Sequence, residues 1–192
     1  MRPGLADAVL DSQGIFRAVL DAMSHPGRVM SLGLEGSTVA PLYPATLAIC
    51  LALVDLETPL WLDPASRTPE VSAHLRFHCG CPIVDDAGRG RFAVVAAPAA
   101  MPALDRFDPG TDEYPDRSAT VIVQARALAA GTGRRLTGPG IASEGRLDVD
   151  GLPAQFWEGL RANHDRFPRG VDVLLTAGLA LVALPRTTWV ED

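Results

Sequence analysis

Short runs of apolar and β-branched residues recur along this chain, with helix-forming segments between them, and this alternation most constrains its fold. The clearest runs are residues 81–84, 92–96 and 120–124. Runs of this length, bounded by turn-forming residues, are typical of buried strands. Strands that alternate with helices favour a sheet packed between helical layers. We therefore predict an α/β fold, a three-layer sandwich with a mixed sheet.

Four helices are expected around these strands. An apolar stripe at helical spacing predicts the first, with Asp11 or Ser12 as its N-cap. Thr68 and Pro69 mark the start of the third, because threonine caps well and proline is tolerated at the first helical position. The predicted spans are residues 11–23, 44–54, 68 to about 79, and a helix that begins near residue 153.

Further strand candidates lie at both ends of the chain. The last two form a hairpin around Ala177-Gly178, which adds antiparallel pairing to the sheet. A stretch rich in Pro, Asp and Gly, residues 98–116, is expected to be a long surface loop. The additional strands are predicted at residues 29–32, 60–62, 134–137, 145–149, 171–176 and 179–184.

Composition and charge narrow the classes of function. A length of 192 residues predicts one domain, residues 1–192, and 47% hydrophobic residues supply a sizeable core. The net charge of −6 argues against binding to nucleic acid or to an anionic membrane surface. The first residues lack the apolar run of a signal peptide, and three cysteines give no disulfide framework. We expect a reduced cytoplasmic protein.

The chain contains no lysine, and all 17 of its basic residues other than histidine are arginine. A pyridoxal phosphate (PLP) enzyme needs a lysine amine to hold the cofactor as an aldimine. The sequence therefore predicts a protein without PLP. Arginine binds phosphate and carboxylate bidentately, although a genome rich in GC gives the same bias without any selection for phosphate.

A glycine-rich loop is the first candidate binding site. Gly138-Pro139-Gly140 follows Arg135 and Thr137, so exposed amides and a guanidinium stand close together. This combination suits an anion, but its spacing matches neither the P-loop nor the dinucleotide-binding glycine motif. The alternative is a tight turn in which the glycines adopt positive φ.

Two histidines and two cysteines form a second candidate cluster. His74 and His78 are four residues apart, which places both on one helical face, and two thiols follow at Cys79 and Cys81. Zinc accepts such ligands. The alternative is that the histidines lie at the edge of the core and the cysteines act as small buried hydrophobic residues. We expect no metal.

Two further residues have both a functional and a structural interpretation. His25 titrates near neutrality and could act in acid–base chemistry, but it also suits the negative end of a helix dipole. Arg186, followed by two threonines, could clamp a phosphate oxygen or anchor the C-terminal tail or another subunit. Motifs of serine nucleophiles are missing from the sequence, and we assign no catalytic residue.

The order and spacing of its motifs resemble one bacterial family, the H subunit of carbon–phosphorus lyase, along almost the whole chain. Each motif is weak alone, and together they are fairly specific. The motifs are Ala22-Met23-Ser24-His25-Pro26-Gly27, Thr58-Pro59-Leu60-Trp61-Leu62, Leu75-Arg76-Phe77-His78, Arg135-Leu136-Thr137-Gly138-Pro139-Gly140-Ile141, Phe167-Pro168-Arg169-Gly170-Val171-Asp172 and Pro185-Arg186-Thr187-Thr188-Trp189.

The resemblance implies a fold like the large domain of PLP-dependent transferases, without the cofactor. It also implies a homodimer that joins the G, I and J subunits of a core complex. That complex attaches a phosphonate to C1′ of ribose in ATP, which displaces adenine and leaves a 5′-triphosphate. The family provides no catalytic residue to carry over.

Two functions from different classes follow from these observations. In the first, which we favour, the chain is an assembly subunit that is not catalytic alone. In the second, it contributes ligand contacts to a phosphonate or ATP-derived ligand. A more remote alternative is a stand-alone metal hydrolase built on the histidine and cysteine cluster. The ligand contacts predicted for the second function are Arg135, Thr137, Gly138, Gly140, Arg76, His78 and Arg186.

Overall fold

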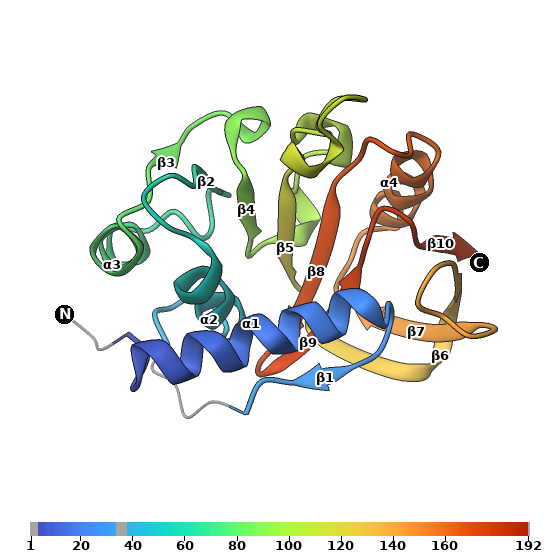
Figure 1. Cartoon of the computed structure of the whole chain (residues 1–192), viewed down its shortest axis with the longest axis horizontal. Helices are drawn as coiled ribbons and strands as arrows, with labels where there is room; N and C mark the ends of the chain where they lie inside the picture. Colours follow the sequence, from blue (N-terminus) through green and yellow to red (C-terminus); the bar gives the residue numbers. More distant parts are fainter. Residues whose placement is uncertain (1–3, 34–37, 192) are drawn as a thin grey trace.

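The computed structural model describes residues 4–33 and 38–191 and has an α/β architecture with two sheets (Figure 1). The larger sheet has seven strands in the order β1-β9-β8-β5-β4-β2-β3, and the smaller has three in the order β10-β6-β7. Strands β8, β5, β4, β2 and β3 are parallel, whereas β9 pairs antiparallel with both β8 and β1. The prediction of an α/β fold with a mixed sheet is therefore confirmed.

The strand predictions largely agree with the structure. The hairpin is confirmed, with Gly178 at φ 60° in its turn. Strand β10 of the smaller sheet was not predicted. The strands are β1 Met30–Ser31, β2 Leu60–Leu62, β3 Ile83–Val84, β4 Phe92–Val95, β5 Thr120–Gln124, β6 Ala127–Thr137, β7 Gly145–Asp150, β8 Asp172–Ala177, β9 Ala180–Leu184 and β10 Trp189–Glu191.

All four predicted helices form, at α1 Ala8–Ser24, α2 Pro44–Leu53, α3 Pro69–Cys79 and α4 Ala154–His164. The predicted cap of α1 was wrong: Asp7 is the N-cap, and its carboxylate accepts from the amides of Val9 and Leu10. The cap of α3 is confirmed, because the Thr68 hydroxyl accepts from the Val71 amide at 3.1 Å. None of the helices in the described ranges has the length and apolar character needed to cross a membrane.

The large sheet separates two hydrophobic clusters. In β5, Ile122 belongs to the cluster beneath α1, α2 and α3, whereas Val121 and Val123 belong to the cluster beneath α4 and the small sheet. Alternate side chains of a strand point to opposite faces, so a sheet with apolar residues at every position must be covered on both. This requirement explains the continuous apolar runs that identified the strands in the sequence.

The segment between β4 and β5 was expected to be a surface loop, and this was only partly correct. It contains three short 3-10 turns, η2 Pro98–Ala100, η3 Leu104–Arg106 and η4 Pro115–Arg117. Leu104 and Phe107 are almost fully buried in the cluster beneath α4. The segment therefore covers one face of the sheet.

The connections after two neighbouring strands leave toward opposite faces of the sheet. The chain leaves β2 for α3, whose Val71 and Leu75 pack into the cluster beneath the first three helices. It leaves β4 for η3, whose Leu104 packs into the other cluster. Because β2 and β4 pair with each other, their carboxyl ends mark a point where the topology diverges. Such points are where open α/β sheets bind ligands.

Candidate functional site

The predicted Gly-Pro-Gly loop is a tight turn packed against the rest of the chain. Gly138 and Gly140 have φ of 130° and 85°, and the Ile141 amide donates to the Gly138 carbonyl at 3.1 Å. A Cβ on Gly138 would lie 2.7 Å from the Thr187 carbonyl oxygen, and one on Gly140 would collide with the carbonyl oxygen of Ser24. The close backbone approach that glycine permits is therefore used by protein backbone on both sides.

Two motifs that are far apart in the sequence meet at this turn. Gly140 packs on Ser24 and Pro26, beside His25 at the end of α1. The His25 Nδ1 lies 3.0 Å from a carboxylate oxygen of Asp21 and 3.0 Å from the Ser24 hydroxyl. His25 is thus part of the C-terminal end of a helix, the position that its structural interpretation predicted.

Arg135 lies in β6 between two carboxylates. Its Nε donates to Glu144 at 2.8 Å, and its Nη1 donates to Glu191 at 2.7 Å. These hydrogen bonds, to Glu191 foremost, raise the pKa of Arg135 above its ordinary value. The pairing joins β6 to β10 and to the segment before β7, so the guanidinium already has two anionic partners within the chain.

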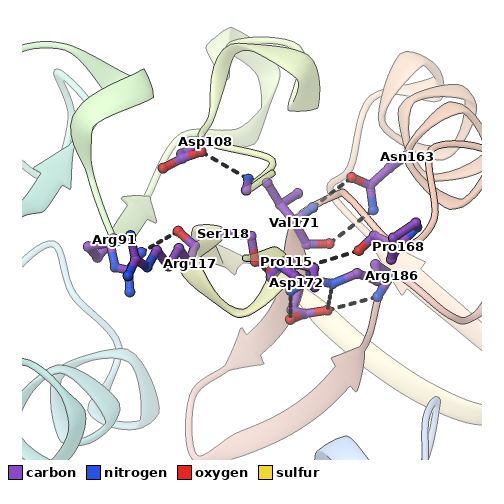
Figure 2. Close-up of polar contacts among 11 residues, drawn as sticks. Arg91, Asp108, Pro115, Arg117, Ser118, Asn163, Pro168, Val171, Asp172 and Arg186 are labelled. Atoms are coloured by element: carbon purple, nitrogen blue, oxygen red, sulfur yellow. Dashed lines mark hydrogen bonds and ion pairs between the residues drawn. The ribbon is translucent and has the colours of Figure 1, made fainter. Parts of the chain in front are cut away.

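Arg186 is held by five hydrogen bonds (Figure 2). Its Nε and Nη2 donate to the two carboxylate oxygens of Asp172, at 3.1 and 2.6 Å. Nη1 donates to the carbonyls of Pro115 and Pro168, and Nη2 also donates to the Ser118 hydroxyl. A guanidinium has five N–H donors, and all five are accounted for. Arg186 therefore ties the C-terminal segment to η4 and to the start of β8.

Apart from Arg186, which lies between β9 and β10, the predicted ligand contacts fall into two separate groups. Arg135, Thr137 and the glycine turn lie on or beside β6, and Thr137 pairs with Trp189 in β10. Arg76 and His78 lie on α3. Figure 1 places α3 at one end of the long axis and the small sheet at the other. The structure therefore does not bring the seven residues into one site, and their role in ligand binding stays a prediction.

The histidine and cysteine cluster has a compact geometry of its own. The rings of His74 and His78 lie 4.3 Å apart, and the Cys79 thiol faces the Cys50 carbonyl oxygen at 3.6 Å. Burial raises the pKa of the Cys50 thiol to about 12, which keeps it protonated. Within residues 4–33 and 38–191, no three His, Cys, Asp or Glu side chains are arranged to hold a metal ion.

An open pocket of about 600 Å³ lies beyond the carboxyl ends of β4 and β5. Gln124, the last residue of β5, is buried and forms part of its floor. Its Oε1 accepts from the Tyr43 amide at 2.6 Å, and its Nε2 donates to the Pro41 carbonyl at 3.1 Å. Both polar ends of this side chain thus fix the segment before α2, which supplies one wall of the pocket.

A buried carboxylate fixes a second wall of the pocket. Asp63, which directly follows β2, accepts from the amides of Ala96 and Ala97 at 3.0 and 2.9 Å and from the Ser66 amide at 2.8 Å. Three backbone donors compensate for the burial of this charge. They also hold Ala96 and Ala97, which line the pocket, in a defined position.

Arg126 and Asp150 form an ion pair that lines the same pocket, with Nη2 of the arginine 2.5 Å from the carboxylate. The two side chains are 73% and 56% exposed. Neither residue was predicted from the sequence. A usable signal was present, because Arg126 comes two residues after a buried parallel strand, at the sheet edge where ligands bind.

The comparisons with known proteins agree with the motif-based resemblance. The profile of the family described as "Bacterial phosphonate metabolism protein (PhnH)" matches residues 3–191. A protein of Rhizobium meliloti (strain 1021), "Alpha-D-ribose 1-methylphosphonate 5-triphosphate synthase subunit PhnH", is 40% identical over 186 residues, which cover 97% of this chain and 93% of that protein.

A second relative is more distant. "Putative C-P lyase subunit protein HtxG" of Stutzerimonas stutzeri is 31% identical over 181 residues, 93% of this chain and 85% of that protein. Both relatives are matched over most of their length, so the likeness extends through the α/β core and the small sheet. The chain belongs to the PhnH family of bacterial phosphonate metabolism proteins.

Proposed function

We propose that this chain is a subunit of a multi-protein enzyme of phosphonate breakdown, as the names of its two relatives state for them. In that assembly it acts mainly as a structural homodimer that joins the G, I and J subunits. The assembly forms ribose 1-phosphonate 5-triphosphate from ATP and a phosphonate, in the cytoplasm. The chain acts without PLP, because it has no lysine, and it is not catalytic alone.

The contrast between its cations and its apolar surface supports an assembly role. Of two cations that the sequence offered for a ligand, Arg186 uses all five of its N–H donors within the chain, and Arg135 is paired with two glutamates. Large apolar side chains, in contrast, face solvent. Exposed apolar patches are typical of surfaces that contact other proteins. This contrast is the observation that carries the proposal.

The outer face of α1 is the surface that we assign to the second copy. Val9, Phe16 and Leu20 are 76%, 47% and 52% exposed, and their spacing puts them on one side of the helix. An exposed apolar stripe of this kind along a surface helix is typical of a face that packs against another protein.

The dimer contact is tested by light scattering of the isolated protein. We expect a dimer mass for the unaltered chain and a monomer mass for a variant with both Val9→Glu and Leu20→Glu, because four buried carboxylates oppose association. Leu56→Glu is the matched control, since Leu56 is 72% exposed and lies outside α1. A dimer that survives the double substitution would remove α1 from the interface.

The function itself is tested by complementation. A phosphonate-using bacterium that lacks its own H subunit should regain growth on methylphosphonate as sole phosphorus source when it carries this chain together with the cognate G, I and J subunits. Growth on phosphate is the control. Failure to restore growth, with all four proteins present and soluble, would refute the proposed function.

A further inference from the structure

We propose that the pocket beyond β4 and β5 binds an organic anion of nucleotide size, with the phosphate of the ligand on Arg126. This inference goes beyond an assembly role. It concerns the isolated chain and residues that differ from all seven predicted ligand contacts.

The position of the pocket supports a ligand site. Its floor is the carboxyl end of two parallel strands, beside the point where the connections of β2 and β4 diverge. Two buried side chains, Gln124 and Asp63, make four hydrogen bonds that hold two of its walls. Walls fixed in this way exist before any ligand binds, which reduces the ordering cost of binding.

Arg126 has more unused N–H donors than the other two arginines. Arg186 uses all five of its N–H groups, and Arg135 uses two and is paired with two carboxylates, whereas Arg126 is paired with one. Within the described residues, the guanidinium of Arg126 donates one hydrogen bond, to Asp150. Four donors therefore stay available to the oxygens of an anion, and a guanidinium binds phosphate through two of them at once.

The remaining lining residues and the volume of the pocket indicate the class of ligand. The pocket is lined mainly by apolar groups, with Ala96, Ala97, Pro98, Leu152 and Pro153 among them, and by Tyr43. Its volume of about 600 Å³ suits a drug-sized or nucleotide-sized molecule and far exceeds a bare phosphate ion. An apolar wall with an aromatic residue suits a planar base.

The carboxylate of Asp150, beside Arg126, further restricts the class of ligand. Asp150 repels a simple anion, but it accepts hydrogen bonds from hydroxyl groups. A nucleotide has a group for each of these three features. Its base can pack on the apolar wall, its ribose hydroxyls can donate to Asp150, and its phosphate can bind Arg126. Inorganic phosphate and small phosphonates satisfy Arg126 alone and meet the repulsion of Asp150.

Calorimetric titration of the isolated chain tests the inference. We expect ATP to bind, and methylphosphonate or inorganic phosphate to bind at least tenfold more weakly. Arg126→Ala should weaken ATP binding about tenfold or more, the usual effect of removing a charged hydrogen-bond donor. Arg89→Ala is the matched control, because it removes the same charge from an exposed position outside the pocket and should leave affinity within about twofold.

A second variant tests the pocket independently of the charge of Arg126. Ala99→Trp places an indole at the exposed rim of the pocket while Arg126 stays intact, and it should also abolish ATP binding. No heat with ATP, equal affinity in Arg126→Ala, or equal binding of methylphosphonate and ATP would each overturn the inference. Because Arg126→Ala should still co-purify with the partner subunits, failure of this inference and failure of the assembly role are distinguishable.

Discussion

At the scale of single residues, an arginine is identified as structural or available only by its hydrogen-bond partners. Arg126 and Arg186 each follow an apolar strand and Arg135 lies within a strand, but none of these positions shows which partner the guanidinium has. Their partners, Glu191, Asp172 and Asp150, are 56, 14 and 24 residues away. Long-range contacts therefore decide which cation is left for a ligand, and sequence periodicity carries no information about them.

Arg186→Ala is expected to destabilise the fold. The substitution leaves Asp172, which is 17% exposed, without its cation and frees the carbonyl groups that Nη1 binds. Removing one partner of a buried pair costs about 3–5 kcal/mol, and the partial exposure of this pair favours the lower value. Urea denaturation measures the loss, with Arg89→Ala as the control. A loss below about 1 kcal/mol would show that the five hydrogen bonds contribute little.

Because the Cys50 thiol is buried, we expect the folded protein to lose stability at alkaline pH. Burial raises its pKa from the ordinary value of 9.0 to about 12, so the unfolded chain releases this proton at a lower pH than the folded chain. The stabilisation is therefore complete below pH 9 and falls between pH 9 and 12. Denaturation across this range should show a shallower fall for Cys50→Ala. Parallel slopes for the two proteins would contradict this assignment.

At the scale of secondary structure elements, the sequence predicted those that bury an apolar face. The four helices and the strands of the large sheet follow from their periodicity, caps and turn residues. The first half of β6, residues 127–133, was missed because it is largely exposed and contains alanine and glycine. The first turn of α1 was missed because Asp7 and Asp11 are equally good caps in the sequence, and only the structure distinguishes them.

The glycine turn allows a test of packing apart from backbone strain. Gly140 and Gly131 have nearly the same φ, 85° and 84°, but a Cβ meets backbone at Gly140 and nothing within 4 Å at Gly131. Gly131→Ala should cost about 1–2 kcal/mol for the left-handed conformation alone. Gly140→Ala should cost about 1–3 kcal/mol more, since it forces the turn away from α1. Equal losses of unfolding free energy would mean that the turn moves without cost.

At the scale of the whole molecule, the sequence predicted the family better than it predicted the site. Family motifs keep their order along the chain, and two of them, at residues 22–27 and 135–141, pack against each other in the structure. A motif can therefore mark an internal contact as readily as a binding site. The pocket, in contrast, is assembled from four separate segments and carries no motif of its own.

The most direct test of the assembly role is co-expression with the cognate G, I and J subunits, with a tag on one of those partners. The purified material is then analysed by size-exclusion chromatography with light scattering. We predict that this chain co-elutes in equal stoichiometry with its partners, at a mass that corresponds to two copies per complex. Elution as a free dimer or monomer, while the other three subunits stay associated, would contradict the account.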